Sequence, residues 1–182
     1  LGTVVVRTGE EERQAVHTTP ESLDLQELLA EMCRAGVQGV AMEVSSHALA
    51  LQRVADVTFA AAIFTNMTQD HLDFHRDMED YFRSKAHLFT VILPAACSVT
   101  GRVGVAVING DDPYGKRLLS ELAGSSCQLY AYGLGENCQV RAVDIHLTPQ
   151  GTEFKLLSPW GEARIALQLC GYFNVYNALA AA

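Results

Sequence analysis

Acidic side chains, histidines and one lysine are concentrated in a single stretch, "TNMTQDHLDFHRDMEDYFRSKAHLF", which covers residues 65–89. Asp70 and His71 lie between the apolar run "FAAAIF", which ends at Phe64, and a predicted helix. Carboxylates and imidazoles can hold a metal ion or move a proton. The acids near Asp80 are typical of a helix N-terminus, where the helix dipole favours negative charge. Asp70 and His71 therefore need another explanation, and His71 is a candidate ligand, although a lone histidine is more often structural.

Lys85 lies in the helix predicted by the second half of this stretch. The apolar residues around it, three or four positions from it or from one another, are Met78, Tyr81, Phe82, Leu88 and Phe89. Helical periodicity therefore places Lys85 on the apolar stripe. One interpretation buries the stem and leaves the ammonium group in water. The other holds the head group in a partly dry site, where loss of hydration favours a neutral, reactive amine. The spacing leaves both open.

Glu43 interrupts the apolar run "GVAMEV", residues 39–44. One interpretation is a carboxylate that reaches water at a strand end or is satisfied in the interior. The other is an oxygen ligand for Mg²⁺, which binds carboxylates together with substrate phosphates. The sequence gives both interpretations equal support.

Hydroxyl groups occur at two predicted turns. "HTTP" (17–20) predicts Thr19 as the N-cap of a helix and Pro20 as its first residue. "SSHALALQR" predicts a strand-to-helix turn, and no GxSxG motif surrounds its serines, which argues against a serine hydrolase. The sequence also contains no GxxxxGK[ST] phosphate-binding loop.

The elements that must position these residues alternate between strands and helices. The predicted strands are residues 3–6, 39–44, 57–64 and 102–108, and the predicted helices are residues 21–35, 77–93 and 112–123. Pro94 is expected to end the second helix. The near-continuous apolar runs 39–44 and 57–64 are typical of strands covered on both faces. From about residue 127, β-like runs separated by turns precede a helical start in "NVYNALAAA".

This alternation predicts an α/β fold with a mostly parallel sheet flanked by helices and a smaller antiparallel β portion near the C-terminal end. Three of the predicted strands end in polar clusters, "MEVSSH", "TNMTQDH" and "NGDD". In open parallel sheets, ligands bind at the carboxyl ends of the strands. The three clusters together therefore favour a ligand site at that edge.

The composition limits the class of protein. The 182 residues suffice for one sizeable domain, and the net charge of −8 argues against sequence-independent binding to nucleic acid. No apolar run approaches the roughly 20 residues that span a bilayer, so membrane insertion is not expected. The five cysteines form no CxxC pair, which fits reduced thiols in the cytoplasm. The first residues, "LGTVVVRTGEE", read as mid-domain sequence, so we expect a piece of a longer protein.

Several motifs occur in an order that resembles the central domain of the Mur ligases. They are "TTPESLDLQELL", "AMEVSSHAL", "TNMTQDHLDFHRDMEDYFRSKAHLF", "NGDDPYG" and "GYFNVYNALAA". Within that family the sequence is most similar to the MurE branch, the UDP-N-acetylmuramoyl-tripeptide synthetases. The resemblance covers essentially residues 1–182. It implies a partial central, ATP-binding domain without the upstream phosphate-binding loop and without the N- and C-terminal domains of the family.

The resemblance implies an ATP-dependent ligase of peptidoglycan precursor synthesis that forms a carbon–nitrogen bond. Such an enzyme phosphorylates UDP-MurNAc-L-Ala-D-Glu to an acyl phosphate, which the amine of meso-diaminopimelate or L-lysine then attacks. The expected cofactors are ATP and Mg²⁺, and the expected location is the cytoplasm. The 182-residue chain by itself is expected to be inactive.

The resemblance also implies roles for individual residues. Glu43 matches a ligand of the Mg²⁺ that bridges the ATP phosphates, and His71 matches a ligand of a second Mg²⁺. Lys85 matches a lysine that CO₂ converts to a carbamate, which then binds the second metal. The residues that match substrate-binding positions are Thr18, Thr19, Ser45 and Arg53, and those that match positions near the adenine are Asn174 and Asn177.

Three other functions stay open on the sequence. The first is a sibling ligase of the same superfamily, of the folylpolyglutamate or cyanophycin synthetase type, although "MEVSSHAL" and "DHLDFH" favour MurE. The second is a non-catalytic remnant that binds a nucleotide or a partner, against which Glu43, His71 and Lys85 argue. The third is a metal-dependent hydrolase, which would release phosphate without an amino-acid acceptor.

Overall fold

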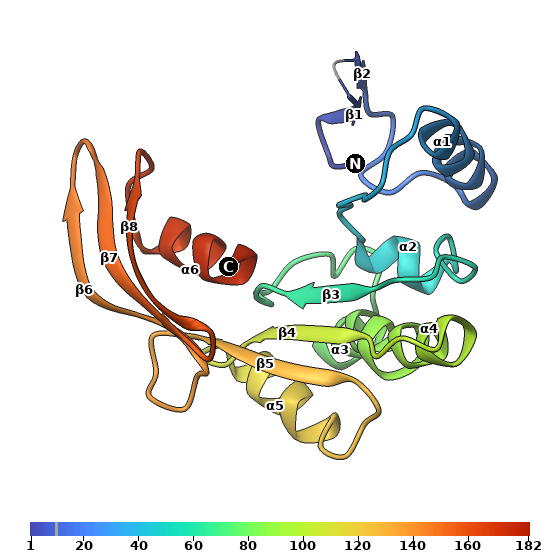
Figure 1. Cartoon of the computed structure of the whole chain (residues 1–182). Coiled ribbons are helices and arrows are strands. Elements are labelled where there is room, and N and C mark those ends of the chain that lie inside the picture. Colours follow the sequence, from blue (N-terminus) through green and yellow to red (C-terminus); the bar gives the residue numbers. More distant parts are fainter. Residues whose placement is uncertain (10) are drawn as a thin grey trace. The chain divides into compact units, whose positions relative to one another are not determined.

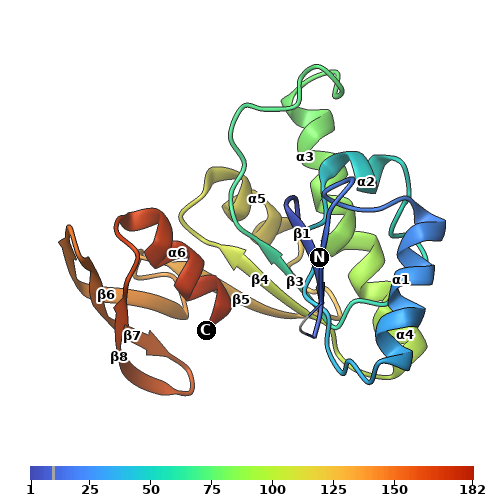
Figure 2. The same cartoon turned by 90° about the horizontal axis from the view of Figure 1, so that it is seen from above.

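The computed structural model describes residues 1–9 and 11–182, with the side chain of Cys97 outside the description. The chain forms two compact units, which are described one at a time. Unit 1 comprises Leu1–Val57 and His71–Leu88, and unit 2 comprises Thr58–Asp70 and Phe89–Ala182. Figures 1 and 2 show the elements of both units.

Unit 1 is mostly helical. Its elements are the antiparallel strands β1 (Val5–Thr8) and β2 (Glu11–Gln14) and the helices α1 (Ser22–Arg34), α2 (Ser46–Ala50) and α3 (Met78–His87). In α1, Leu25 and Met32 are buried two turns apart, as the periodicity predicts. The N-cap of α1 is Glu21, so the prediction that Thr19 caps this helix is wrong.

Unit 2 contains a six-stranded mixed sheet. Its strands, in spatial order, are β3 (Ala61–Phe64), β4 (Val105–Asn109), β5 (Gln128–Gly133), β6 (Val140–Thr148), β7 (Gly151–Ser158) and β8 (Gly161–Leu167). The strands from β3 to β6 pair in parallel, and β6, β7 and β8 pair antiparallel. This confirms the predicted α/β class and the antiparallel portion near the C-terminal end.

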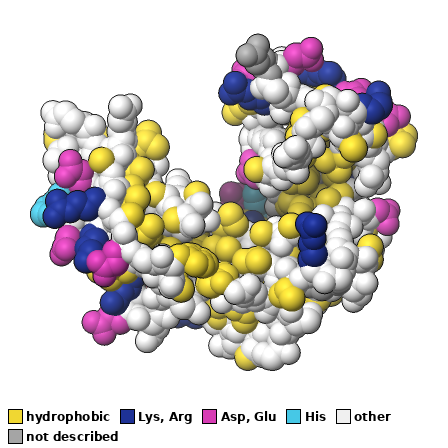
Figure 3. Space-filling view, in the orientation of Figure 1, with side chains coloured by type: hydrophobic (Ala, Val, Ile, Leu, Met, Phe, Trp, Pro, Cys, Tyr) yellow, Lys and Arg dark blue, Asp and Glu magenta, His cyan; other side chains and the backbone are white. Residues whose placement is uncertain are grey.

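The helices of unit 2 pack on both sides of this sheet. They are α4 (Leu93–Thr100), α5 (Pro113–Glu121) and α6 (Tyr172–Ala181), and α5 and α6 lie on opposite faces (Figure 1). Val175 and Leu179 of α6 pack against a core that also contains Tyr132, Val140 and Phe154. Figure 3 shows that charged side chains gather on the outer side of β6–β8, away from α6. The chain thus places apolar side chains toward α6 and charged ones toward water.

Pro94 does not end the helix that contains Lys85, contrary to the prediction. A π-helical turn, η1 (Leu88–Ile92), follows α3 directly, and α4 begins at Leu93. Proline inside a helix lacks the N–H for the i−4 carbonyl and its ring clashes with that carbonyl. The wider π turn changes the hydrogen-bond register before the proline, so Pro94 occupies the first turn of a new α-helix, where it is tolerated.

The strand predicted at residues 39–44 does not form. Two hydrogen bonds connect this segment to Leu1. The Leu1 amino group donates to the Ala41 carbonyl at 2.8 Å, and the Glu43 N–H donates to the Leu1 carbonyl at 2.9 Å. Most of its residues are exposed. An apolar run forms a strand only where a partner supplies a full ladder of backbone hydrogen bonds, which these two contacts do not.

The strand predicted at residues 57–64 is shorter than expected, and only one of its two faces is buried. It forms β3, where Ala62 and Phe64 are buried while Ile63 is 48% exposed. β3 is the first strand in the sheet order, so it has one neighbour. The expectation of a strand buried on both faces is therefore wrong for these residues.

Two predictions from composition can be compared with the structure. Among the described side chains, four cysteines are free thiols, namely Cys33, Cys127, Cys138 and Cys170, and that of Cys97 lies outside the description. Within the described part of the chain, no helix has the length and apolar character needed to cross a bilayer.

Candidate functional site

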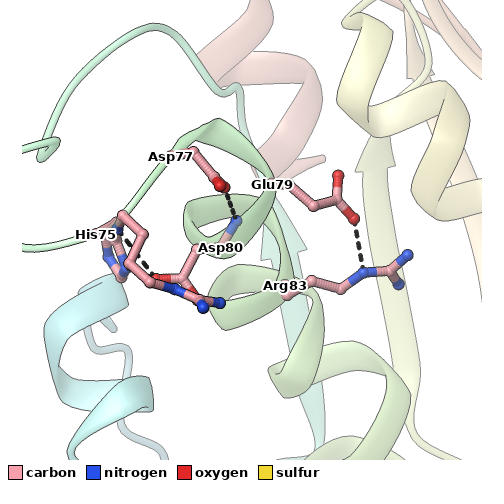
Figure 4. Close-up of polar contacts among 6 residues, drawn as sticks. His75, Asp77, Glu79, Asp80 and Arg83 are labelled. Carbon is pink, nitrogen blue, oxygen red and sulfur yellow. Dashed lines mark hydrogen bonds and ion pairs between the residues drawn. The ribbon is translucent and has the colours of Figure 1, made fainter.

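The segment that carries the predicted site residues leads into α3, and its acids organise the start of that helix. The Asp77 carboxylate accepts a hydrogen bond from the Asp80 N–H at 2.8 Å, which identifies Asp77 as the N-cap. Arg83 donates to Glu79 one turn away at 2.9 Å (Figure 4). The backbone N–H of Arg76 donates to Asp80 and holds the pKa of that carboxyl below its usual value. These acids have the structural role that the sequence predicts.

Lys85 lies in the second half of α3 and is half-buried. Its Nζ lies over the ring of Tyr81, 5.1 Å from the ring centroid. The two residues are four positions apart, which places them on the same side of the helix. Tyr81 is only 5% exposed, so the lysine head group lies against a buried ring. This contact is compatible with both interpretations of Lys85, and its role in a partly dry site stays a prediction.

His71 adopts an unusual backbone conformation, with φ of 55°. Left-handed backbone is uncommon for a residue with a side chain and often marks a functional site. The carbonyl of His71 accepts hydrogen bonds from the N–H groups of Phe74 and His75, at 3.1 and 3.0 Å. The His71 ring lies edge-on to the rings of His47, with centroids 5.1 Å apart, and of Tyr81, with centroids 5.6 Å apart. This turn thus brings His71 next to the ring that also contacts Lys85.

His75 connects α2 to α3 and is 3% exposed. Its Nε2 shares a hydrogen bond of 2.9 Å with Ser46 Oγ, and its Nδ1 lies 3.7 Å from Asp80 Oδ2. Burial lowers the pKa of His75, and the nearby His47 adds to this effect while Asp80 opposes it, so the ring is neutral at pH 7. Ser46 is 1% exposed, which keeps a substrate away from its hydroxyl. The contacts of His75 with Ser46 and Asp80 therefore have a structural role, and these three residues are not a nucleophilic triad.

Glu43 is exposed, which agrees with a carboxylate that can reach a ligand or water. Thr3 Oγ1 donates a hydrogen bond of 2.7 Å to Glu43 Oε2, and Thr3 Oγ1 also lies 3.2 Å from Thr18 Oγ1. Thr18 is thereby linked to Glu43 through one hydroxyl group. Both residues belong to unit 1, as do His71 and Lys85.

The hydroxyl of Thr19 joins two segments of unit 1. Thr19 is 1% exposed, its Oγ1 donates to the Glu43 carbonyl at 2.8 Å, and the same atom accepts from the Ser45 N–H at 3.0 Å. The Ser45 side chain accepts from the Ala48 N–H at 3.1 Å and caps α2. The hydroxyls of Thr19 and Ser45 are thus engaged within the protein, and Thr19 holds Glu43 and the start of α2 in place.

Arg53 supports the same turn. Its guanidinium donates to the Thr19 carbonyl at 3.1 Å and forms an ion pair with Glu21. The Nε of Arg53 is buried and has no hydrogen-bond partner in the structure. A buried donor without a partner costs free energy, which a ligand that accepts from it would recover. This orphaned donor is the observation that favours Arg53 as a binding residue.

We expect Thr19→Val to lower the free energy of unfolding by about 1–3 kcal/mol, because it leaves the Glu43 carbonyl and the Ser45 N–H without the hydroxyl. Urea unfolding of the full-length protein that contains this chain measures the change. Thr19→Ser is the matched control, since it keeps the hydroxyl and should lose less. Wild-type stability of Thr19→Val would contradict this structural role.

The polar cluster "NGDD" at the end of β4 connects neighbouring elements of unit 2. The Asn109 side chain donates to the Thr65 carbonyl at 2.8 Å, beyond the end of β3. Asp112 caps α5 by accepting from the N–H groups of Tyr114 and Gly115. These contacts engage the polar side chains within the protein. The cluster therefore supports the sheet edge structurally, and its contribution to a ligand site stays a prediction.

Asp111 of the same cluster fixes α6. Its carboxylate accepts from the Leu134 N–H at 2.6 Å, from the Gly135 N–H at 3.2 Å and from the Tyr176 hydroxyl at 2.8 Å. Burial, together with Asp111, raises the pKa of Tyr176, so its hydroxyl stays protonated and donates. Buried Cys138, whose pKa burial also raises, lies close to the backbone of this turn.

Asn174 and Asn177, the predicted adenine contacts, lie on α6. Gly171, with φ of 98°, precedes the helix, and Asn174 Nδ2 donates to the Cys170 carbonyl at 2.9 Å. Asn177 is exposed. Residues three apart share a helix face, so Asn177 lies on the same side of α6 as Asn174, whose amide group is engaged with the Cys170 carbonyl. The Tyr176–Asp111 bond holds this helix against the end of β5.

The predicted metal ligands are Glu43, His71 and Lys85 of unit 1. Among the described residues, no three His, Cys, Asp or Glu side chains are grouped so that they could hold a metal ion. Glu43 offers one carboxylate and His71 one imidazole, while Lys85 becomes an oxygen ligand only after CO₂ adds to its amine. Mg²⁺ is usually bound by one or two carboxylates with water and substrate phosphates completing the octahedron. One carboxylate and one imidazole would therefore leave most of the coordination positions of Mg²⁺ to water and to substrate phosphates.

A hollow lies in unit 2, on the charged side of β6–β8. Its volume is about 420 Å³, and its charged lining residues are Asp144, Glu153, Lys155 and Arg164. None of the residues predicted from the sequence lines it. It is therefore separate from the candidate site.

Sequence reasoning missed three residues around His71 and Lys85 in unit 1, namely His47, His75 and Tyr81, and it missed Asp111 as the residue that fixes α6 in unit 2. His75 follows His71 by one helical turn, and Tyr81 precedes Lys85 by the same interval, so the spacing contained a signal for both. His47 and Asp111 belong to motifs quoted above, but nothing in their spacing predicts their partners.

The whole chain matches a known family. The sequence model for the Mur ligase middle domain covers residues 1–182. The chain belongs to the Mur ligase family. As a Mur ligase middle domain, it has the mixed sheet and helices described above.

Individual members of the Mur ligase family are closely similar over all of this chain. UDP-N-acetylmuramoyl-L-alanyl-D-glutamate–2,6-diaminopimelate ligase of Geobacter metallireducens is 47% identical over 181 residues, which is 100% of this chain and 34% of the relative. The ligase of the same name from Gloeobacter violaceus is 47% identical over 181 residues, 100% of this chain and 35% of the relative. A solved structure of an enzyme with this name has a TM-score of 0.82 at 27% identity, covering 99% of this chain and 36% of that one. The chain thus spans about a third of the length of these relatives.

Proposed function

We propose that this chain is the central part of an ATP-dependent ligase that adds the third amino acid to UDP-MurNAc-L-Ala-D-Glu. The observation that carries the proposal is the 47% identity, over the whole chain, to relatives named as 2,6-diaminopimelate ligases. Those names favour diaminopimelate over L-lysine as the amino acid that is added. The exposed Glu43 and the contact of both His71 and Lys85 with Tyr81 support a site of the required kind.

The proposed reaction proceeds in two transfers. The γ-phosphoryl group of ATP moves to the substrate carboxylate, so that an acyl phosphate forms and ADP leaves. The amine of the amino acid then attacks the acyl carbon, the carbon–nitrogen bond forms, and phosphate leaves. Bound Mg²⁺ would offset the negative charge that these steps concentrate.

Each of the predicted site residues has a proposed role. Glu43 would hold one Mg²⁺, and His71 with carbamylated Lys85 would hold the second. Thr18 and Arg53 would contact the UDP-sugar dipeptide, with the buried, unpartnered Nε of Arg53 as the supporting observation. The role proposed for Thr19 and Ser45 is to shape that turn, since their hydroxyls are engaged within the protein. Asn174 and Asn177 would contact the adenine.

The proposed activity also defines partners and location. The partners are ATP, the UDP-MurNAc-dipeptide and an amino acid, all small molecules. The net charge of −8 makes nucleic acid an unfavourable partner. We propose the cytoplasm as the location, which agrees with the free cysteines of the described residues.

The full-length protein should form an amide when it is given ATP, Mg²⁺, UDP-MurNAc-L-Ala-D-Glu and diaminopimelate. Mass spectrometry of the product and release of phosphate measure the reaction, and L-lysine in place of diaminopimelate is the matched comparison. Absence of product with both amino acids would contradict the proposal. Phosphate release without any acceptor would instead indicate a hydrolase.

The 182-residue chain alone should form no amide, because it spans about a third of the length of the relatives named as ligases. The same assay on this chain, beside the full-length protein as positive control, measures this. Product formed by the chain alone would overturn the expectation.

A further inference from the structure

One buried aromatic ring touches both residues proposed for the second metal site. The Tyr81 ring lies 5.1 Å from Lys85 Nζ and 5.6 Å from the His71 ring, both measured to the Tyr81 centroid. The His71 ring meets it at 85°, which is edge-on. Because Tyr81 is only 5% exposed, its ring has little freedom to move away from either neighbour.

The Tyr81 ring is itself held by His75. The two rings stack at 24° with centroids 5.1 Å apart. His75 in turn is bound to Ser46 of α2, lies beside Asp80 of α3, and donates its backbone N–H to the His71 carbonyl at 3.0 Å. One histidine thus connects the α2 helix, the turn at His71 and the α3 helix.

We propose that Tyr81 is a positioning residue for His71 and Lys85, and that His75 keeps its ring in place. This inference rests on the function proposed above. A lysine side chain is long and flexible and has many rotamers, so its end is poorly placed without support. A ring against which both groups pack restricts them to the same small region. Supporting residues of this kind commonly contribute 10- to 100-fold to metal affinity or activity.

The proposal distinguishes the ring from the hydroxyl of Tyr81. The contacts with His71, His75 and Lys85 described above are made by the ring. Tyr81→Phe keeps the ring and should behave within about twofold of wild type. Tyr81→Leu keeps a large apolar side chain but removes the flat ring, so it should lose the positioning.

The experiment uses the full-length protein loaded with ¹³C-labelled bicarbonate. The ¹³C NMR line of the Lys85 carbamate is recorded while Mn²⁺ is added in the presence of ATP, because a paramagnetic ion bound at the carbamate broadens that line. Tyr81→Leu should need about tenfold more Mn²⁺ for the same broadening, and its kcat should fall about tenfold or more. Tyr81→Phe should restore both values.

Phe154→Leu is the control for a merely structural effect. Phe154 is buried to a similar extent, at 4% exposed, but lies in the core of unit 2. The Phe154→Leu substitution should lower the thermal unfolding temperature without changing the Mn²⁺ concentration needed to broaden the carbamate line. Equal Mn²⁺ dependence of wild type and Tyr81→Leu would overturn the inference. A wild-type protein that fails to ligate, or shows no carbamate line, would overturn the proposed function instead.

Discussion

Replacing Lys85 with alanine in the full-length protein should lower the rate of amide formation by more than about a hundredfold. The loss should exceed the 10- to 100-fold typical of outer-shell partners, because the proposed carbamate would bind the metal directly. The position of Lys85 against a buried ring is the structural reason to expect more than a lost surface charge. Steady-state kinetics at saturating ATP and Mg²⁺ measure the effect.

Short carboxylates such as formate or acetate should restore part of the activity of Lys85→Ala, since they can supply the missing oxygen ligand. Lys116→Ala is the matched control, because Lys116 is an exposed lysine on a different helix, α5. It should keep near-wild-type turnover. Lys85→Ala with normal turnover would show that this lysine only buries its stem and has no part in the reaction.

Gly115→Ala should destabilise the protein by about 3 kcal/mol, at the upper end of typical overpacking costs. A Cβ at this position would lie 1.9 Å from the carbonyl oxygen of Asn109 and 3.1 Å from its carbonyl carbon. Both atoms belong to the backbone at the end of β4, so no side chain can rotate away. Helix propensity by itself would favour alanine by about 1 kcal/mol, so the sign of the effect tests the close approach of α5 to β4.

Thermal unfolding of the full-length protein should show the transition of this domain about 6–12 °C lower for Gly115→Ala. Gly39→Ala is the matched control, because a Cβ there meets no atom within 4 Å. Its unfolding temperature should stay within a few degrees of wild type. If Gly115→Ala unfolds at the wild-type temperature, α5 does not pack against the end of β4 as closely as described.

Much of the fold follows from local pattern. The helix predicted at residues 21–35 forms as α1, and Asp112 with Pro113 starts α5 where the "DP" pair indicates a helix start. The predictions failed where a strand lacked a partner or where the backbone took a hydrogen-bond register that residue patterns do not show. Residues 39–44 have the apolar composition of a strand but no full ladder of backbone partners, and Pro94 is accommodated by a π turn that sequence periodicity does not reveal.

For the candidate site, too, some features follow from the sequence and others only from the tertiary structure. The sequence by itself determined that Lys85 lies on the apolar side of a helix and that His71 belongs to the polar turn before it, because both follow from the pattern of neighbouring residues. The order of the motifs along the chain indicated the Mur ligase family. Only the tertiary structure decided which groups meet. The Thr19 hydroxyl binds atoms 24 and 26 residues away, and Tyr176 reaches Asp111 across 65 residues. Such contacts depend on how the elements pack, and no local preference along the chain encodes them.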